Sequence, residues 1–396
     1  ENGHKYTINQ ETGEITGPTE GTPPTTGKTD GSFDVEKGVN TPKLGNNMEL
    51  VKYNEGTQEW VKDETNSAYS YEEQTGSPVN SKTNEWANAR VTINGVESYF
   101  VWIPRYEYKI DSETKTIDVR FIPTTQTTAD EGYIIHPAFT SNKENGGWST
   151  ELAGLWIGKY ETSQSDAGIT VDNMGSSGII QVKPNVTSWR EITIGQMYEK
   201  AKSYSTDLQS HMLKNSEWGA VAYLTHSKYG RNGTEIAINN SSDFITGTSG
   251  GTTDASSSDT KYVYNDTEKG VLASSTGNIY GIYDLSGGAY ENVASYYSGS
   301  TSSNLTINGS QLVNETNREY VTAYDGTDVN TDYRQGDATY ETNGWNEDYA
   351  GVVNRGNPFI GRGGGYYSSY VAGVFNFANG NGFGDYRRCF RVCLAV

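Results

Sequence analysis

Few residues of this chain carry the imidazole or thiol groups that bind transition metals most readily. They are four histidines and two cysteines: His4, His136, His211, His226, Cys389 and Cys393. No HxxxH or HxD cluster brings such ligands together. We therefore expect each histidine to lie at the surface or to be hydrogen-bonded inside the fold.

The two cysteines do not make a disulfide framework. If residues 389–393 form a β-strand, the two side chains share a face about 13 Å apart, beyond the reach of a disulfide. We expect Cys389 and Cys393 to be small buried side chains.

Binding chemistry is more evident in residues 362–396, where Gly, Tyr, Ser, Asn, Asp and Phe precede the apolar sequence CFRVCLAV. Tyr supplies wide amphipathic contact area, and Ser, Gly and Asn supply adaptable hydrogen bonds, which is the composition of a binding surface. The same composition also fits a glycine-rich surface loop before a terminal strand.

Two anchors in this tail, Arg362-Gly363-Gly364 and Phe390-Arg391-Val392, resemble the closing segment of the formylglycine-generating-enzyme type of C-type lectin fold. Residues 279–293, IYGIYDLSGGAYENV, resemble that fold's GLYDMSGNVWEWV run. The resemblance covers roughly residues 99–396. It implies an α+β fold with two helices, short irregular strands and long loops.

Within that fold, the tail is similar to the variable proteins of diversity-generating retroelements, in which adenine-directed mutagenesis diversifies a C-terminal ligand-binding face. The resemblance implies a scaffold over residues 372–377 and substitutable positions on either side. The candidate ligand-binding positions are Gly365, Tyr367, Ser368, Tyr370, Ala378, Gly380, Phe383, Gly384, Asp385 and Tyr386.

The elements that must position this face begin with a β-hairpin over residues 91–103, whose turn is Asn94-Gly95. Further strands are expected over residues 106–110, 116–122 and 155–162. Thr193 is expected to cap one helix, whose buried face carries Ile194, Met197, Tyr198 and Ala201. Asn215 is expected to cap a second helix, with Trp218, Val221 and Ala222 on one face. Both faces are predicted to be core.

The domain organisation follows from composition. Residues 1–47 are rich in Thr, Gly and Pro and are expected to form an extended linker or stalk. Residues 48–90 are expected to be a small β-rich packing segment, and residues 91–396 the ligand-binding domain. That domain carries two insertions, at 230–266 and 298–345, and the first is expected to be a mobile surface loop.

Charge and hydropathy restrict the partners. The formal net charge of −19 argues against nucleic acid. The sequence contains no apolar run of the length that spans a bilayer, and the absence of an initial Met leaves room for a removed leader or anchoring segment before Glu1. We expect an extracellular, cell-surface or phage-particle location and an unknown protein or cell-surface ligand.

The sequence departs at specific positions from the motifs that an enzyme or a sugar-binding protein of this fold would need. The copper-binding cysteine pair of formylglycine-generating enzymes lies between RGGS and GFR, where this chain has no cysteine. The EPN, QPD and WND tripeptides of calcium-dependent sugar binding are also absent, although structural calcium in the Asp/Asn-rich loops is possible. The sequence therefore favours a non-enzymatic ligand-binding protein without a cofactor, and the alternative is a metal-dependent oxidase-type enzyme of the same fold.

The ligand-binding interpretation predicts a burial pattern in the tail. Phe375, Phe377, Phe390 and Val392 should point into the core, whereas Tyr367, Tyr370 and Tyr386 should be exposed. Tyr283, Leu285 and Tyr290 should pack beneath the same face.

Overall fold

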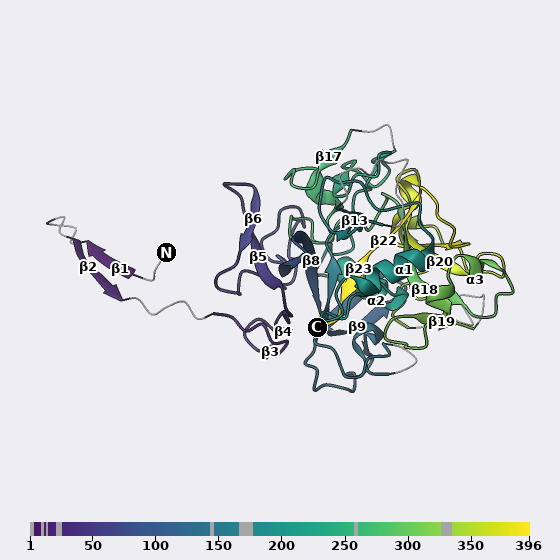
Figure 1. Cartoon of the computed structure of the whole chain (residues 1–396). Helices are drawn as coiled ribbons and strands as arrows, with labels where there is room; N and C mark the ends of the chain where they lie inside the picture. Colours follow the sequence, from purple (N-terminus) through teal and green to yellow (C-terminus); the bar gives the residue numbers. More distant parts are fainter. Residues whose placement is uncertain are drawn as a thin grey trace.

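The fold is α+β and consists mostly of strands, as a computed structural model of the whole chain shows (Figure 1). The structure describes residues 4–8, 12, 15–20, 26–142, 146–165, 177–256, 260–325 and 335–396. Within these ranges two helices are longer than one turn: α1 (Ile194–Ser203) and α2 (Asn215–His226).

The largest sheet has the strand order β15-β23-β12-β8-β7-β5-β6, and its pairs are antiparallel. Its centre is the predicted hairpin, whose turn residues Asn94 and Gly95 have φ values of 51° and 76°. The strands are β5 (Met48–Asn54), β6 (Glu59–Lys62), β7 (Asn88–Ile93), β8 (Val96–Pro104), β12 (Gly154–Gly158), β15 (His211–Met212) and β23 (Val392–Leu394). Residues 48–90 thus contribute β5, β6 and the start of β7 to the central sheet.

A second sheet has the order β19-β18-β20-β21, with β22 also paired to β18. It holds three of the four strands to which the C-terminal tail contributes: its strands are β18 (Tyr290–Tyr297), β19 (Thr322–Tyr324), β20 (Phe359–Gly363), β21 (Gly373–Gly380) and β22 (Arg388–Phe390). Figure 1 shows the yellow C-terminal strands running through the body of the fold beside α1 and α2. The tail is therefore built into two sheets rather than laid over them.

The remaining described elements are short. A three-stranded sheet has β9 (Tyr106–Asp111) between β10 (Thr116–Phe121) and β11 (Ile134–Ile135). Two-stranded pairs join β1 (His4–Ile8) to β2 (Ile15–Glu20), β3 (Phe33–Asp34) to β4 (Val39–Asn40), β13 (Ser163–Gln164) to β14 (Ile180–Gln181), and β16 (Thr248–Ser249) to β17 (Tyr262–Val263). Single turns of helix are α3 (Asn304–Ile307), α4 (Ser310–Val313), η1 (Pro137–Phe139), η2 (Gly270–Ala273), η3 (Trp345–Glu347) and η4 (Ser369–Val371).

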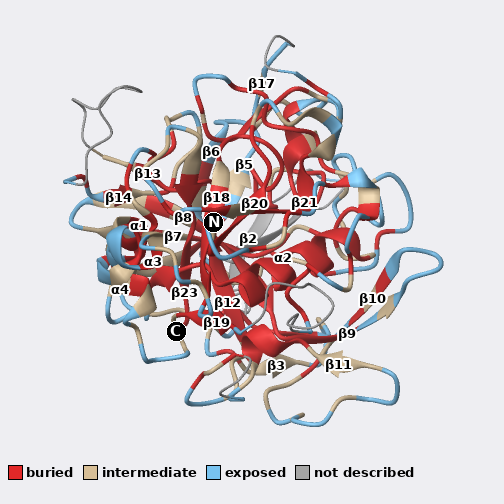
Figure 2. Ribbon diagram, turned by 90° about the vertical axis from the view of Figure 1, so that its right-hand side faces the viewer, coloured by how far each residue is buried: buried red, intermediate tan, exposed pale blue. Residues whose placement is uncertain are grey.

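Both predicted helices are present. Thr193 caps α1 as expected, through a capping box with Gln196. The expected cap of α2 is wrong by one residue: Lys214 is the N-cap, and the Glu217 carboxylate accepts its backbone N–H at 2.8 Å. Every residue of α2 is buried, and Figure 2 shows the helix in red, so it is a central element rather than an amphipathic one.

Residues 26–47 do not belong to the expected stalk, because they pack on the central sheet. Val39 and Asn40 are fully buried. The indole N–H of Trp102 donates to the Asn40 carbonyl at 3.2 Å, and that of Trp156 to the Lys43 carbonyl at 2.6 Å. Earlier in the chain, β1 and β2 pair with each other, so the described residues there form a hairpin rather than a single extended strand.

The first insertion is also packed rather than a loose surface loop. Ile236, Ala237 and Ile238 are buried, and the backbone N–H of Gly247 donates to both carboxylate oxygens of Asp284 at 2.9 Å. The Asn239 amide donates to the same carboxylate at 2.9 Å. This insertion is ordered because it satisfies a carboxylate that the core buries; residues 257–259 lie outside the described part.

The predicted burial pattern of the tail is confirmed. Phe375, Phe377, Phe390 and Val392 are buried in the main core. Cys389 and Cys393 are buried and free, but the sequence CFRVC is not one strand: Cys389 lies in β22 of one sheet and Cys393 in β23 of the other. No described helix has the length and apolar character needed to cross a membrane.

A truncation series tests the packing of residues 26–47. A chain beginning at Met48 should be less stable than one beginning at Thr26 by about 2–5 kcal/mol, because it loses buried apolar contacts and leaves two indole N–H groups unpaired. Denaturant unfolding of the two truncated chains measures the difference. Equal midpoints would contradict the packing described here.

Candidate binding surface

Four aromatic side chains of the tail face solvent. The exposed fractions are 45% for Tyr367, 55% for Tyr370, 62% for Phe383 and 50% for Tyr386. Large aromatic rings are usually covered in a folded domain, so this much exposure within a short segment marks a surface suited to association. These four side chains are called the aromatic set below.

Neighbouring side chains, namely Tyr290 and Arg387, contact two members of this set. Tyr290 lies beneath Tyr367, with ring centroids 6.5 Å apart. The Arg387 guanidinium lies 5.2 Å from the Tyr386 ring centroid and forms a two-point ion pair with Asp385, at 2.8 and 3.0 Å. These hydrogen bonds from Arg387 lower the pKa of the Asp385 carboxyl. The surface thus presents Tyr and Arg, the side chains that dominate protein interfaces.

A support under the surface comes from the first insertion, which sequence reasoning did not connect to the tail. The buried ring of Phe244 lies 5.0 Å from Tyr366 and 6.3 Å from Tyr386. The Arg190 guanidinium stacks on the same ring at 3.8 Å and donates to the Tyr386 carbonyl. No periodic pattern links residues 190, 244 and 386, so only the fold reveals this contact.

The remaining candidate positions are less accessible. Ser368, Gly384 and Asp385 are half-buried at the rim of the aromatic set. Gly365, Ala378 and Gly380 are buried, which corrects their expected place on the face. A side chain at Gly380 would meet the Arg388 guanidinium, with its Cβ 2.9 Å from Cζ, because β21 packs against that arginine.

The base of the tail is fixed by Arg362, which is fully buried in β20. Its guanidinium donates to the Asn215 side-chain carbonyl at 2.9 Å and to the backbone carbonyls of Asp337 and Ala338 at 3.1 and 2.9 Å. Burial lowers the pKa of Arg362 to about 10, so it remains a cation at neutral pH. Gly364 follows at φ 80°, where a Cβ would lie 2.8 Å from that of Ala372, so the backbone passes too close for any larger residue.

Beneath β22 lies a cluster of buried charges. The Arg391 guanidinium donates to both carboxylate oxygens of Glu291 and to the carbonyls of Gly158 and Tyr283, the latter two at 2.7 and 2.9 Å. Glu161 and Asp284 are buried beside this pair, and burial raises the pKa of both carboxyls. The cluster is closed to solvent, and its geometry is that of an internal brace.

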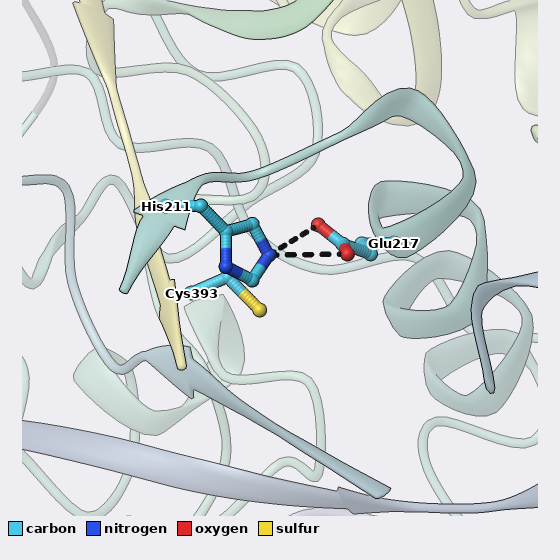
Figure 3. A group of neighbouring side chains, drawn as sticks. All are labelled: His211, Glu217 and Cys393. Atoms are coloured by element: carbon cyan, nitrogen blue, oxygen red, sulfur yellow. Dashed lines mark hydrogen bonds and ion pairs between the residues drawn. The ribbon is translucent and has the colours of Figure 1, made fainter. Parts of the chain in front are cut away.

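One group of residues has the ligand types of a transition-metal site. One ligand atom each of His211, Glu217 and Cys393 lies within 4.8 Å of the others (Figure 3). His211 and Cys393 face each other across the β15–β23 pair, and Glu217 comes from the first turn of α2. Sequence spacing gave no sign of this group, because Cys393 is distant along the chain from the other two residues.

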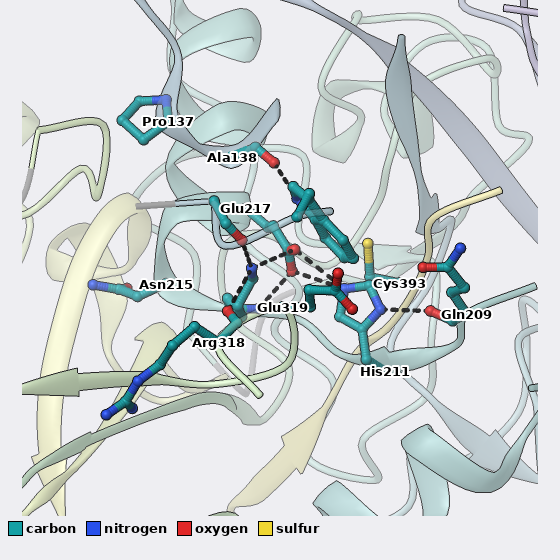
Figure 4. Close-up of polar contacts among 12 residues, drawn as sticks. Pro137, Ala138, Gln209, His211, Asn215, Glu217, Arg318, Glu319 and Cys393 are labelled. Atoms are coloured by element: carbon teal, nitrogen blue, oxygen red, sulfur yellow. Dashed lines mark hydrogen bonds and ion pairs between the residues drawn. The ribbon is translucent and has the colours of Figure 1, made fainter. Parts of the chain in front are cut away.

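The hydrogen bonds around this group describe an ion-pair network (Figure 4). His211 Nδ1 contacts the Gln209 carbonyl at 2.8 Å and Nε2 contacts Glu217 Oε1 at 3.1 Å, so the expected hydrogen-bonded histidine is confirmed here. The Lys214 ammonium lies 3.6 Å from Glu217 Oε1 and donates to the Gly146 carbonyl at 2.7 Å. Burial alone would raise the pKa of Glu217, but His211 and Lys214 together lower it.

In this arrangement two basic side chains, His211 and Lys214, already contact the Glu217 carboxylate. His211, Glu217 and Cys393 are all fully buried. A substrate therefore has no access to them in this conformation. The network satisfies the first turn of α2 and joins it to the C-terminal strand, which is a structural task.

Comparison of the chain with models of protein families and with curated proteins gave no match.

Glu217→Gln tests the ion-pair network. The change keeps the shape of the side chain but leaves the buried Lys214 and His211 without a carboxylate, so we expect a loss of about 3–5 kcal/mol in the free energy of unfolding. Glu64→Gln, which breaks an exposed pair with Lys62, is the matched control and should change stability little. Equal effects of the two changes in denaturant unfolding would refute the structural role.

Proposed function

We propose that this chain is a non-enzymatic ligand-binding protein of the formylglycine-generating-enzyme type of C-type lectin fold, displayed on a cell or phage surface. Its C-terminal tail forms the binding face, and a retroelement diversifies that face. The observation that carries the proposal is the separation within the tail: Tyr367, Tyr370, Phe383 and Tyr386 are exposed, whereas Phe375, Phe377 and Phe390 are buried.

This separation is what a diversified binding protein requires. A side chain that only solvent contacts is replaceable with little effect on folding, whereas a buried ring is not. The backbone of the tail is held by β20, β21, β22 and β23 and by Arg362, none of which depends on the exposed rings. The exposed positions can therefore vary while the scaffold stays fixed.

The energetics fit a protein or cell-surface ligand. Aromatic and arginine side chains supply most of the energy at protein interfaces, and Tyr loses little conformational entropy when a partner covers it. The net charge of −19 disfavours a nucleic acid as that partner.

The alternative function is a metal-dependent oxidase-type enzyme of the same fold. Such an enzyme needs a metal that substrate can reach. The group His211, Glu217 and Cys393 has suitable ligand types but is fully buried, so the binding-face proposal is favoured.

Replacing the aromatic set by Ala tests the binding face directly. The change should abolish binding, at about 2 kcal/mol or more for each anchor, while altering stability by within about 0.5 kcal/mol for each residue. The unaltered chain is first used to screen an array of purified extracellular proteins. Binding of the variant is then measured to the proteins that this screen identifies. Phe377→Ala is the control and should cost about 3–5 kcal/mol of stability through lost core packing.

If the aromatic set destabilised the protein as much as Phe377→Ala, the tail would be core and the binding face would have to lie elsewhere.

Sequencing the gene across a population of its host tests the diversification. Substitutions should concentrate at the accessible positions, namely Tyr367, Ser368, Tyr370, Phe383, Gly384, Asp385 and Tyr386, and should avoid the buried phenylalanines. They should also arise at adenines of a parental template. An even spread of substitutions across residues 362–396 would refute this part of the proposal.

A further inference from the structure

A small cavity lies behind the tail, where the end of α2 meets the first insertion and the start of β21. Its volume is about 10 Å³, the space of a single water-sized sphere. Oxygen-bearing side chains line it, from Thr225, Thr234, Glu235 and Asn346, and Gly373 closes one side. No Lys or Arg is among the residues that line it.

Several of the oxygens at this cavity are buried without a hydrogen-bond partner. They include Thr225 Oγ1 and Glu235 Oε1 on the wall, and Thr225 is only 2% exposed. Behind Gly373, Asp348 is 4% exposed and its Oδ1 also has no partner, whereas its Oδ2 accepts the Phe375 N–H at 2.9 Å. A buried oxygen without a partner is costly, and a group of them around one space indicates a ligand that satisfies them together.

The Asp348 carboxylate is not among the lining groups, but it lies against Gly373 of the cavity wall. A Cβ added to Gly373 would lie 2.3 Å from each of the two carboxylate oxygens. Because Gly373 also lines the cavity, the carboxylate abuts the cavity wall at the one residue that has no side chain to screen it.

Neither of the two carboxylates forms an ion pair with a Lys or Arg among the residues that the structure describes. Burial raises the pKa of Asp348 to about 8, with a further contribution from Glu235, and burial followed by Glu347 raises that of Glu235 to about 7. His226, which lines the cavity, is kept neutral because burial lowers its pKa. Arg362 acts on Asp348 only at a distance, since its hydrogen bonds go to the Asn215 side chain and to the backbone carbonyls of Asp337, Ala338 and Val374.

We propose that this cavity is a binding site for one hard divalent cation, Ca²⁺, held by the carboxylates of Glu235 and Asp348 and the hydroxyl of Thr225. Oxygen atoms are the ligands that Ca²⁺ prefers, and it accepts irregular surroundings that Mg²⁺ does not. The wall contains no soft ligand of the kind that selects copper or zinc. This site is separate from the aromatic set and does not depend on the proposed function.

The cation joins parts of the chain that are far apart in sequence. Asp348 follows η3, where Gly344, Asn346 and Glu347 all have positive φ, and its other oxygen holds the backbone of β21 at Phe375. Glu235 comes from the first insertion, and Thr225 from the last turn of α2. Ca²⁺ at this point therefore braces the strand from which the tail is built.

Calcium titration of the full chain after treatment with EDTA tests the site. Isothermal calorimetry with CaCl₂ in 0.15 M salt should give one saturable site, and MgCl₂ should bind at least about tenfold more weakly. Because Ca²⁺ binds the folded state, 10 mM CaCl₂ should raise Tm by about 2–5 °C.

Two variants locate the site. Asp348→Asn and Glu235→Gln should each weaken calcium binding at least about tenfold and remove the rise in Tm. Glu235 is only half-buried, so its variant preserves the test if Asp348→Asn does not fold. Glu341→Gln is the matched control, because Glu341 is a half-buried carboxylate, as Glu235 is, but its oxygens are partnered by Tyr108, Tyr223 and the Gly336 N–H. Its calcium response should be unchanged.

The proposal is wrong if the unaltered chain shows neither a saturable heat nor a rise in Tm. It is also wrong if calcium binds with no single stoichiometry, or if both variants respond to calcium as the unaltered chain does. If the variants instead raise stability at pH 8 and calcium has no effect on the unaltered chain, the two carboxylates share a proton rather than a metal ion.

Discussion

The ion pair between Arg391 and Glu291 is the interaction on which the two main sheets depend. Arg391 lies between β22 and β23, where the chain leaves one sheet and enters the other. Its guanidinium donates to the Gly158 carbonyl in β12 and to the carboxylate of Glu291 in β18. Burying these two charges costs free energy, which is offset only when the partners that both sheets supply are in place around the pair. Removing Arg391 or Glu291 would leave the other charge buried without a partner.

The polar interior explains how a surface rich in glycine and tyrosine stays well defined. Arg362, Arg391 and Lys214 each donate to backbone carbonyls from distant segments, so the irregular loops are held by buried cations rather than by regular strands. Long loops without such contacts are ordinarily the least ordered part of a domain. In this fold the loops that carry the tail and its supports are fixed from beneath, and the exposed rings add nothing to that support.

The sequence predicted the elements whose signals are local. Short stretches of sequence predicted the Asn94-Gly95 turn, the N-cap of α1, and the burial of three tail phenylalanines beside exposed tyrosines. The packing of residues 26–47 and of the first insertion could not be predicted in this way. Composition indicates how much apolar surface a segment can bury, but it does not show which distant N–H group or carboxylate the segment will hydrogen-bond. The contact of Cys393 with His211 and Glu217, and the cavity beside Glu235 and Asp348, depend on contacts across long separations, for which a single sequence carries no periodic sign.

The place of β23 in the sheet has a consequence for how the protein is made. This strand pairs with β12 on one side and β15 on the other, so residues 392–394 lie inside the largest sheet and not at its edge. β12 and β15 leave the ribosome well before residues 392–394 are synthesised. Until then, the backbone groups of β12 and β15 that pair with β23 have no partner. Contacts between such distant segments are slow to form. Folding of the largest sheet therefore requires residues 392–394 to be translated in frame, and a copy with a premature stop or a frameshift before them would lack an inner strand and be open to degradation.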